Sequence, residues 1–209
     1  MMANRLDDLF TKNASAADFS RGYIDCLVQV LSAIDHDAVA RFIAILLDAR
    51  DRAARIFFLG NGGSAATASH FANDLAIGTR CMRKPFRALS LTDNVAVITA
   101  IGNDDGYENI FVQQLQALMV AGDVVVGISA SGNSPNVLNA IDHANLNGGI
   151  TVGLTAFDGG QLKDLAQFNV HIATNKGEYG PAEDGHMVLD HLVGAYLYRK
   201  VRLEADTAL

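Results

Sequence analysis

The chain has 209 residues, of which 50% are hydrophobic and 19% charged, so it is too apolar for a disordered protein and long enough for one sizeable core. Its formal net charge of −7 argues against a broad nucleic-acid surface, which needs clustered Lys and Arg. We expect a single domain over residues 1–209, with N-terminal helices in 1–50 and an α/β core in 51–203.

The cysteine content and the hydropathy pattern indicate a cytoplasmic protein. Cys26 and Cys81 allow at most one disulfide, so the chain is not a disulfide scaffold and reduced thiols are expected. The N-terminus lacks the apolar region of a signal peptide, and no run of about 18 apolar residues occurs. We therefore expect neither a membrane nor a nucleic acid as a partner.

Residues 16–50 show helical spacing of apolar residues in two stretches. The first apolar face comprises Tyr23, Ile24, Leu27, Val28, Leu31 and Ile34, and the second comprises Val39, Phe42, Ile43, Leu46 and Leu47. Asp35 and Asp37 lie between them as turn or cap residues. This pattern predicts two helices packed on the core, with a dedicated oligomer face as the alternative.

From residue 55 the pattern changes to short β-rich runs that alternate with helical segments. The predicted strands are 55–60, 86–92, 123–130, 150–156 and 168–174, and the predicted helices are 64–78, 94–102, 108–120, 135–147, 160–166 and 184–203. Strand and helix in alternation predict an α/β fold, a five-stranded parallel sheet between helices. Ligands of such folds bind beyond the carboxyl ends of the strands, so these ends are where chemistry is expected.

The first strand ends in Gly60-Asn61-Gly62-Gly63-Ser64. Adjacent glycines allow positive φ and close approach of the backbone, and Ser64 can cap the next helix or bind a ligand at its N-terminus. The spacing matches neither a P-loop nor a dinucleotide fingerprint. An anion site and a plain strand-to-helix turn both remain open for this segment.

Two further strand ends carry polar side chains. Ser129, Ser131 and Ser134 surround Gly132, and Pro135 follows at the expected first helical position, a pattern typical of an anion cradle without lysine. After the second strand, Asp93 can bond sugar hydroxyls or cap the helix that begins near Asn94.

A third group of residues has the chemistry of a divalent metal site. His70 and Asp74 are four apart in a predicted helix and share a face. The segment 180–197 adds Glu183, Asp184, His186, Asp190 and His191. Glu183 and His191 are separated by about 12 Å of helix rise, so they can share an ion only if Glu183 lies at or before a helix start near 182–184. The spacing leaves His186 with Asp190 as a rival pair.

The segments "GNGGSAATASHF", "LTDN", "AIGNDDGYENIF" and "ISASGNSPNV" together resemble the sugar isomerase (SIS) family, in its phosphoheptose isomerase branch, over residues 20–203. The resemblance implies a flavodoxin-like three-layer fold and an N-terminal helical pair used in oligomer packing. It also implies a homotetramer with active sites between subunits. The implied reaction converts sedoheptulose 7-phosphate to D-glycero-D-manno-heptose 7-phosphate, for lipopolysaccharide or capsule heptose.

The resemblance also assigns site residues. It places a metal, expected to be zinc, on His70, Asp74, Glu183 and His191, and acid–base work on Asp74 and His191, with Glu183 as an alternative base. Asp74 stands where the branch has Glu, and Glu183 where it has Gln. The expected substrate-binding residues are Asn61, Gly62, Gly63, Ser64, Asp93, Ser129, Ser131 and Ser134, with the four serines on phosphate.

Two other functions remain open. The chain can isomerise another ketose phosphate, or it can be a non-catalytic SIS module that binds a phosphosugar for regulation. A pure binding module has no need of two histidines and two carboxylates in matching positions. Those residues therefore favour an enzyme that moves protons through an enediol with the help of a metal.

Overall fold

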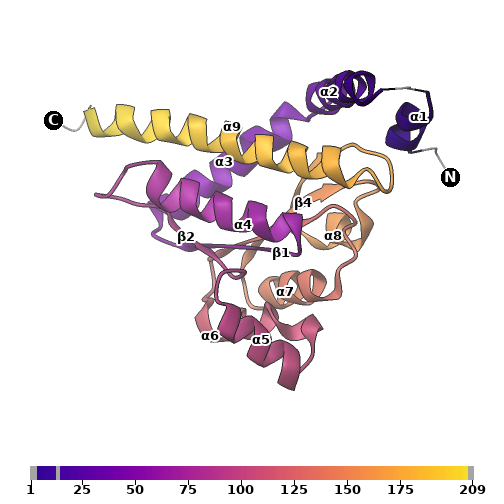
Figure 1. Cartoon of the computed structure of the whole chain (residues 1–209). Coiled ribbons are helices and arrows are strands. Elements are labelled where there is room, and N and C mark those ends of the chain that lie inside the picture. The colour runs from indigo at the N-terminus through magenta and orange to yellow at the C-terminus, as the bar shows by residue number, and fades with distance from the viewer. Residues whose placement is uncertain (1–3, 13–14, 207–209) are drawn as a thin grey trace.

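The computed structural model describes residues 4–12 and 15–206, and its centre is a parallel sheet of five strands (Figure 1). The strands are β1 (Arg55–Gly60), β2 (Arg87–Ser90), β3 (Val124–Ser129), β4 (Ile150–Ala156) and β5 (Phe168–Ile172), in the order β2-β1-β3-β4-β5. Each predicted strand is present, with ends that differ by at most two residues. The predicted parallel α/β fold is therefore confirmed.

Helices cover both faces of the sheet because side chains alternate along each strand. Ile56 and Phe58 of β1 pack on the face covered by α3 (His36–Asp51), α4 (Gly63–Asn73) and α9 (Tyr179–Asp206). Phe57 and Leu59 pack on the opposite face, which is covered by α6 (Val112–Leu118), α7 (Pro135–Leu146) and α8 (Gly160–Leu165). Figure 1 shows the resulting three layers.

Three helices differ from their predicted ranges by more than the one or two residues seen at other helix ends. The predicted helix 64–78 is α4 followed by a π-helical turn, Asp74–Gly78. The predicted helix 108–120 is a 3-10 turn, Tyr107–Asn109, and the shorter α6. The last helix begins at Tyr179, so the expected start near 182–184 is wrong, and Pro181 lies in the first turn, where no intrahelical N–H bond is lost.

The predicted N-terminal helices are α2 (Ala16–Ser32) and α3, and a further helix, α1 (Arg5–Lys12), precedes them. Asp35 caps α3 by accepting hydrogen bonds from the amides of Asp37 (2.9 Å) and Ala38 (3.0 Å). The helix α3 buries six residues, whereas α2 buries only Cys26 and Val30. The pair is therefore unequal, with only α3 a core helix.

The remaining helix, α5 (Val95–Asp104), begins after β2 and buries none of its residues. Among the described helices, none has both the length and the apolar character needed to cross a membrane.

Candidate active site

A pocket lies at the carboxyl ends of β1 and β3, beside the start of α9. It has a volume of about 160 Å³ and is lined by Asn61, Ser64, Ile128, Ser129, Ala130, Ser131, Ser134, Tyr179 and Glu183. We call it the serine pocket. It brings together five of the eight residues predicted to bind substrate, along with Glu183. It therefore joins the two serine-containing strand ends that the sequence singled out.

The hydroxyl groups of the serine pocket have unused donor capacity. Ser64 and Ser129 are only 6% and 5% exposed. The Oγ of Ser129 accepts a hydrogen bond from the Gly132 amide (3.1 Å), and that of Ser131 accepts one from the Asn133 amide (3.4 Å). Within the described chain, none of the four serine hydroxyls donates to a protein acceptor, and no Lys or Arg lines the pocket. Four free O–H donors suit an oxyanion such as phosphate.

The glycines of the first loop shape the wall of this pocket. Gly62 has a φ of +54° and occupies the cap position of α4, a conformation that favours glycine. A Cβ at Gly60 would lie 2.8 Å from the Ser64 carbonyl oxygen and 2.9 Å from that of Ile128, so no side chain fits there. A Cβ at Gly63 would overlap the Glu183 carboxyl group. Close packing therefore requires glycine at 60, and the Glu183 carboxyl lies directly against Gly63.

Asn61 belongs to a small polar network that the sequence did not predict. Its side chain exchanges two hydrogen bonds with Asn136 (2.9 and 2.8 Å), and its Oδ1 also accepts one from the Tyr107 hydroxyl (3.1 Å). Asn136 is buried in the first turn of α7, and Tyr107 lies in the loop after α5. The only sequence signal for Asn136 was its place two residues after Ser134. The network fixes the orientation of the Asn61 amide.

Asp93, Gly62 and Gly63 lie outside the lining of the serine pocket. The Asp93 carboxylate accepts hydrogen bonds from the hydroxyls of Ser69 and Thr92. The cap of α5 is Asn94, whose side chain accepts from the Val97 amide (3.2 Å), so the alternative role of Asp93 as the cap is wrong. A role for Asp93 in binding sugar stays a prediction.

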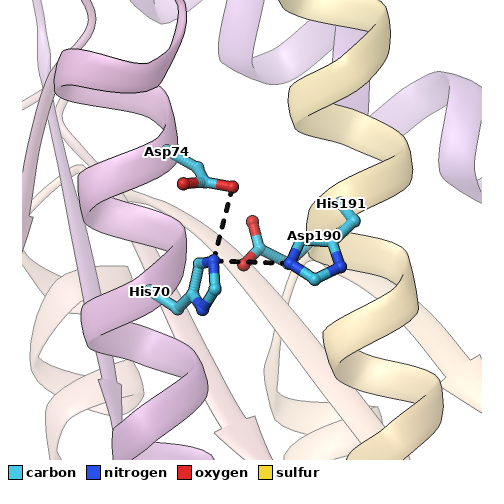
Figure 2. A group of neighbouring side chains, drawn as sticks. All are labelled: His70, Asp74, Asp190 and His191. Carbon is cyan, nitrogen blue, oxygen red and sulfur yellow. Dashed lines mark hydrogen bonds and ion pairs between the residues drawn. The ribbon is translucent and has the colours of Figure 1, made fainter.

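A second site lies between α4 and α9 and consists of His70, Asp74, Asp190 and His191 (Figure 2). We call it the His/Asp cluster. The Nε2 atoms of His70 and His191 are 3.4 Å apart, and His70 Nε2 is 3.6 Å from Asp74 Oδ2. One ligand atom from each of the four side chains lies within 4.8 Å of all the others. Imidazole and carboxylate groups from two helices therefore meet at one point.

The spacing of the two histidines in the cluster is compatible with a tetrahedral metal ion. Two nitrogens bound to zinc at about 2.0–2.1 Å with a tetrahedral angle lie about 3.3–3.4 Å apart, which agrees with the separation of His70 and His191. The Asp190 side chain is fully buried, and both of its carboxylate oxygens lack a hydrogen-bond partner in the described chain. Buried polar groups are nearly always paired, so a cation would satisfy Asp190.

The electrostatics of Asp190 agree with that interpretation. Burial, together with the smaller effect of the negative charge of Asp74, raises the pKa of the Asp190 carboxyl to about 7. In the protein without a cation, ionised Asp190 is therefore costly.

The membership of the His/Asp cluster differs from both sets of candidate metal ligands that the sequence left open. His186 is fully buried away from it, with Nε2 3.3 Å from the Thr155 carbonyl oxygen, and burial lowers the pKa of His186 to about 4. The rival pair is therefore split, and only Asp190 joins the cluster. Glu183 is not among the four residues, because α9 begins at Tyr179 and places Glu183 beside Gly63. Its role as a metal ligand stays a prediction.

The serine pocket and the His/Asp cluster lie along one pair of helices. Helix α4 packs along α9, and both run in the same direction from the pocket (Figure 1). Ser64 and His70 are six residues apart in α4, which corresponds to about 9 Å of helix rise. A ligand with an anionic end in the pocket can therefore bring its other end to the cluster.

The chain is similar to known proteins in sequence. A sequence model of the SIS domain matches residues 22–156. A phosphoheptose isomerase from Geobacter metallireducens is 39% identical over 168 residues, which cover 79% of this chain and 88% of that protein.

Solved structures of phosphoheptose isomerases are similar as well. The enzyme from Neisseria gonorrhoeae superimposes with a TM-score of 0.79 at 29% identity, covering 88% of this chain and 98% of the other. The enzyme from Francisella tularensis gives a TM-score of 0.80 at 25% identity, covering 88% and 99%. The chain belongs to the SIS domain family, in its phosphoheptose isomerase branch, and is an enzyme of the sugar-phosphate isomerase class.

Proposed function

We propose that the chain converts sedoheptulose 7-phosphate to D-glycero-D-manno-heptose 7-phosphate. The observation that carries this proposal is the position of an anion-binding pocket and a proton-transfer cluster about 9 Å apart along the α4–α9 pair. An extended heptose phosphate has the length to reach both, whereas a triose phosphate does not. The relatives named above as phosphoheptose isomerases support the same substrate.

The phosphate end of the substrate binds in the serine pocket. The hydroxyls of Ser64, Ser129, Ser131 and Ser134 donate to the phosphate oxygens, and the N-terminus of α4 adds a favourable dipole. Asn61, held by Asn136 and Tyr107, lies where the sugar leaves the pocket and is oriented to bond its hydroxyls.

Asp74 transfers the carbon-bound proton. Its carboxylate takes a proton from C1 of the ketose to give a cis-enediol and returns that proton to C2, while the hydroxyl proton passes from O1 to the adjacent O2. The reaction is balanced, because no atom or electron leaves the substrate. Asp74 is suited to this role because it lies at the edge of the cluster and is partly exposed.

His70, Asp190 and His191 would hold a divalent ion, for which zinc is the best match to two imidazoles and a carboxylate. A catalytic zinc site keeps three protein ligands and an open position, and a bound ion polarises the substrate oxygens and stabilises the enediolate charge. This assignment gives His191 a ligand role in place of the acid–base role implied by the resemblance. It leaves Glu183 at the phosphate end.

We also propose a homotetramer with active sites between subunits, located in the cytoplasm and supplying heptose for lipopolysaccharide or capsule. Exposed apolar side chains on α2 and α9 support an oligomer, and they include Ile24, Val28, Val188, Leu192 and Tyr196. Both cysteines are free, which is consistent with a reducing compartment.

The test is an isomerase assay on sedoheptulose 7-phosphate with the purified protein, in zinc and then in chelator. We expect turnover that chelator abolishes and zinc restores. Ser131→Ala should raise KM about tenfold with a smaller change in kcat, because it removes one phosphate contact. Turnover of a different ketose phosphate alone would contradict the proposed substrate, and no turnover of any would contradict the reaction.

A further inference from the structure

Glu183 is a carboxylate inside a pocket that otherwise suits an anion. It lines the serine pocket, and its carboxyl group lies against Gly63 at the start of α4. A negative charge is favourable at a helix N-terminus, so the side chain gains stabilisation from α4 there. The same position is where the dipole of α4 would favour a bound phosphate.

Two neighbouring acidic side chains have partners, whereas Glu183 has none in the described chain. Glu178 is bonded by Arg5 and Asn175, and Asp184 accepts a hydrogen bond from the Tyr23 hydroxyl (2.6 Å). Within residues 4–12 and 15–206, Glu183 forms no hydrogen bond or ion pair, and no Lys or Arg lines its pocket. Apart from the dipole of α4, no group among the described residues holds the Glu183 carboxyl in its place.

Ser64 supplies an independent indication that this end of the pocket takes a ligand. The side chain is 6% exposed, lines the pocket and makes no hydrogen bond within the described residues. Its hydroxyl therefore keeps a free donor on the pocket side, where a ligand oxygen can accept its hydrogen bond. Glu183 and a ligand bonded to Ser64 would therefore occupy adjoining space.

We propose that the Glu183 carboxylate is an internal competitor of phosphate, so that this residue sets how tightly the serine pocket holds dianionic ligands. The inference rests on the proposed function, which places the phosphate in this pocket. A carboxylate and a phosphate at contact distance repel each other, and without a neighbouring cation nothing offsets that repulsion. The Glu183 side chain must move away before a dianion can bind.

The test is calorimetric titration of the purified full-length protein with inorganic phosphate, a probe that has no sugar hydroxyls. Glu183→Gln keeps the shape, removes the charge and adds an N–H donor, and we expect phosphate binding about tenfold tighter, or about 1.4 kcal/mol. Glu183→Ala should also bind more tightly, because the charge is lost. Asp142→Asn is the control, since this exposed residue of α7 changes the net charge equally outside the pocket.

A double variant shows whether the gain arises in the serine pocket. Adding Ser131→Ala to Glu183→Gln should remove most of the gain, whereas phosphate held elsewhere would not respond. Equal or weaker binding of phosphate by both Glu183 variants would overturn the inference and leave the proposed substrate intact. Failure of every variant and of the wild type to bind phosphate would overturn both the inference and the phosphate end of the proposed function.

Discussion

Two fully buried carboxylates lie in or directly before α9, and their surroundings are opposite in kind. Glu178, just before the helix, is bonded by the Arg5 side chain and the Asn175 amide, and these bonds lower its pKa to about 2 despite its burial. Asp190, in the middle of the helix, has no hydrogen-bond partner among the described residues, and burial raises its pKa to about 7. The first carboxylate is satisfied within the fold, whereas the second requires a cation or a proton from outside. This difference indicates that Glu178 stabilises the structure, whereas Asp190 has a functional role.

The largest expected effect is on turnover, at a residue of the proposed catalytic centre. Asp74→Asn removes the proposed base and should lower kcat by about 10²–10⁴, with little change in KM or in zinc affinity. Steady-state kinetics and a zinc titration measure these quantities.

Asp74→Glu is the matched control, because Glu is the residue that the branch has at this position. It should retain measurable turnover. Full activity of Asp74→Asn would show that Asp74 is not the base.

Asp190→Asn tests whether the unpartnered carboxylate is a metal ligand. We expect zinc affinity to fall about 100-fold, measured by competition with a chromophoric chelator, because ligand replacement costs at least as much as loss of an outer partner. Glu183→Gln serves as the comparison and should leave zinc affinity unchanged. The opposite pattern, with zinc lost in Glu183→Gln and retained in Asp190→Asn, would restore the ligand set implied by the resemblance.

Glu178→Gln tests the stabilising end of the comparison. The folded pKa of about 2 lies below the ordinary value near 4.3, so the ionised Glu178 stabilises the fold above about pH 4 and this stabilisation is lost as the pH falls toward 2. The variant should lose about 3 kcal/mol at pH 7 and show a flatter acid limb in chemical denaturation.

The zinc affinity and turnover of Glu178→Gln should stay close to those of the wild type. A variant as stable as the wild type at pH 7 would mean that the Arg5 ion pair does not stabilise the fold.

The sequence predicted the sheet and the serine pocket well because both depend on short-range patterns. The five apolar runs, and the glycine and serine loops that follow two of them, are visible in the sequence itself. Parallel strands then bring their carboxyl ends, and these loops, to one edge of the sheet. The assignment of His70, Asp74 and His191 to one centre also agrees with the geometry of the cluster. The division of the chain after residue 50 stays a prediction.

The position of Asp190 could not be predicted, because it depends on how two helices pack. Residues adjacent in sequence usually face different directions on a helix, so Asp190 and His191 did not look like members of one site. The start of α9 at Tyr179 places Glu183 away from the cluster, and Glu178, directly before that start, is bonded to the distant Arg5. The hydrogen bonds that Asn136 and Tyr107 form with Asn61 could not be predicted either, because they join segments that are far apart in the sequence.

Gly63 and Glu183 illustrate how such packing links distant parts of the chain. The missing side chain at 63 is the space in which the carboxyl group of 183 lies, although 120 positions separate the two residues. A methyl group at 63 becomes acceptable only when the side chain at 183 is shortened or turned away. The coupling runs in one direction, because a change at 183 leaves Gly63 undisturbed, whereas any side chain at 63 displaces the one at 183.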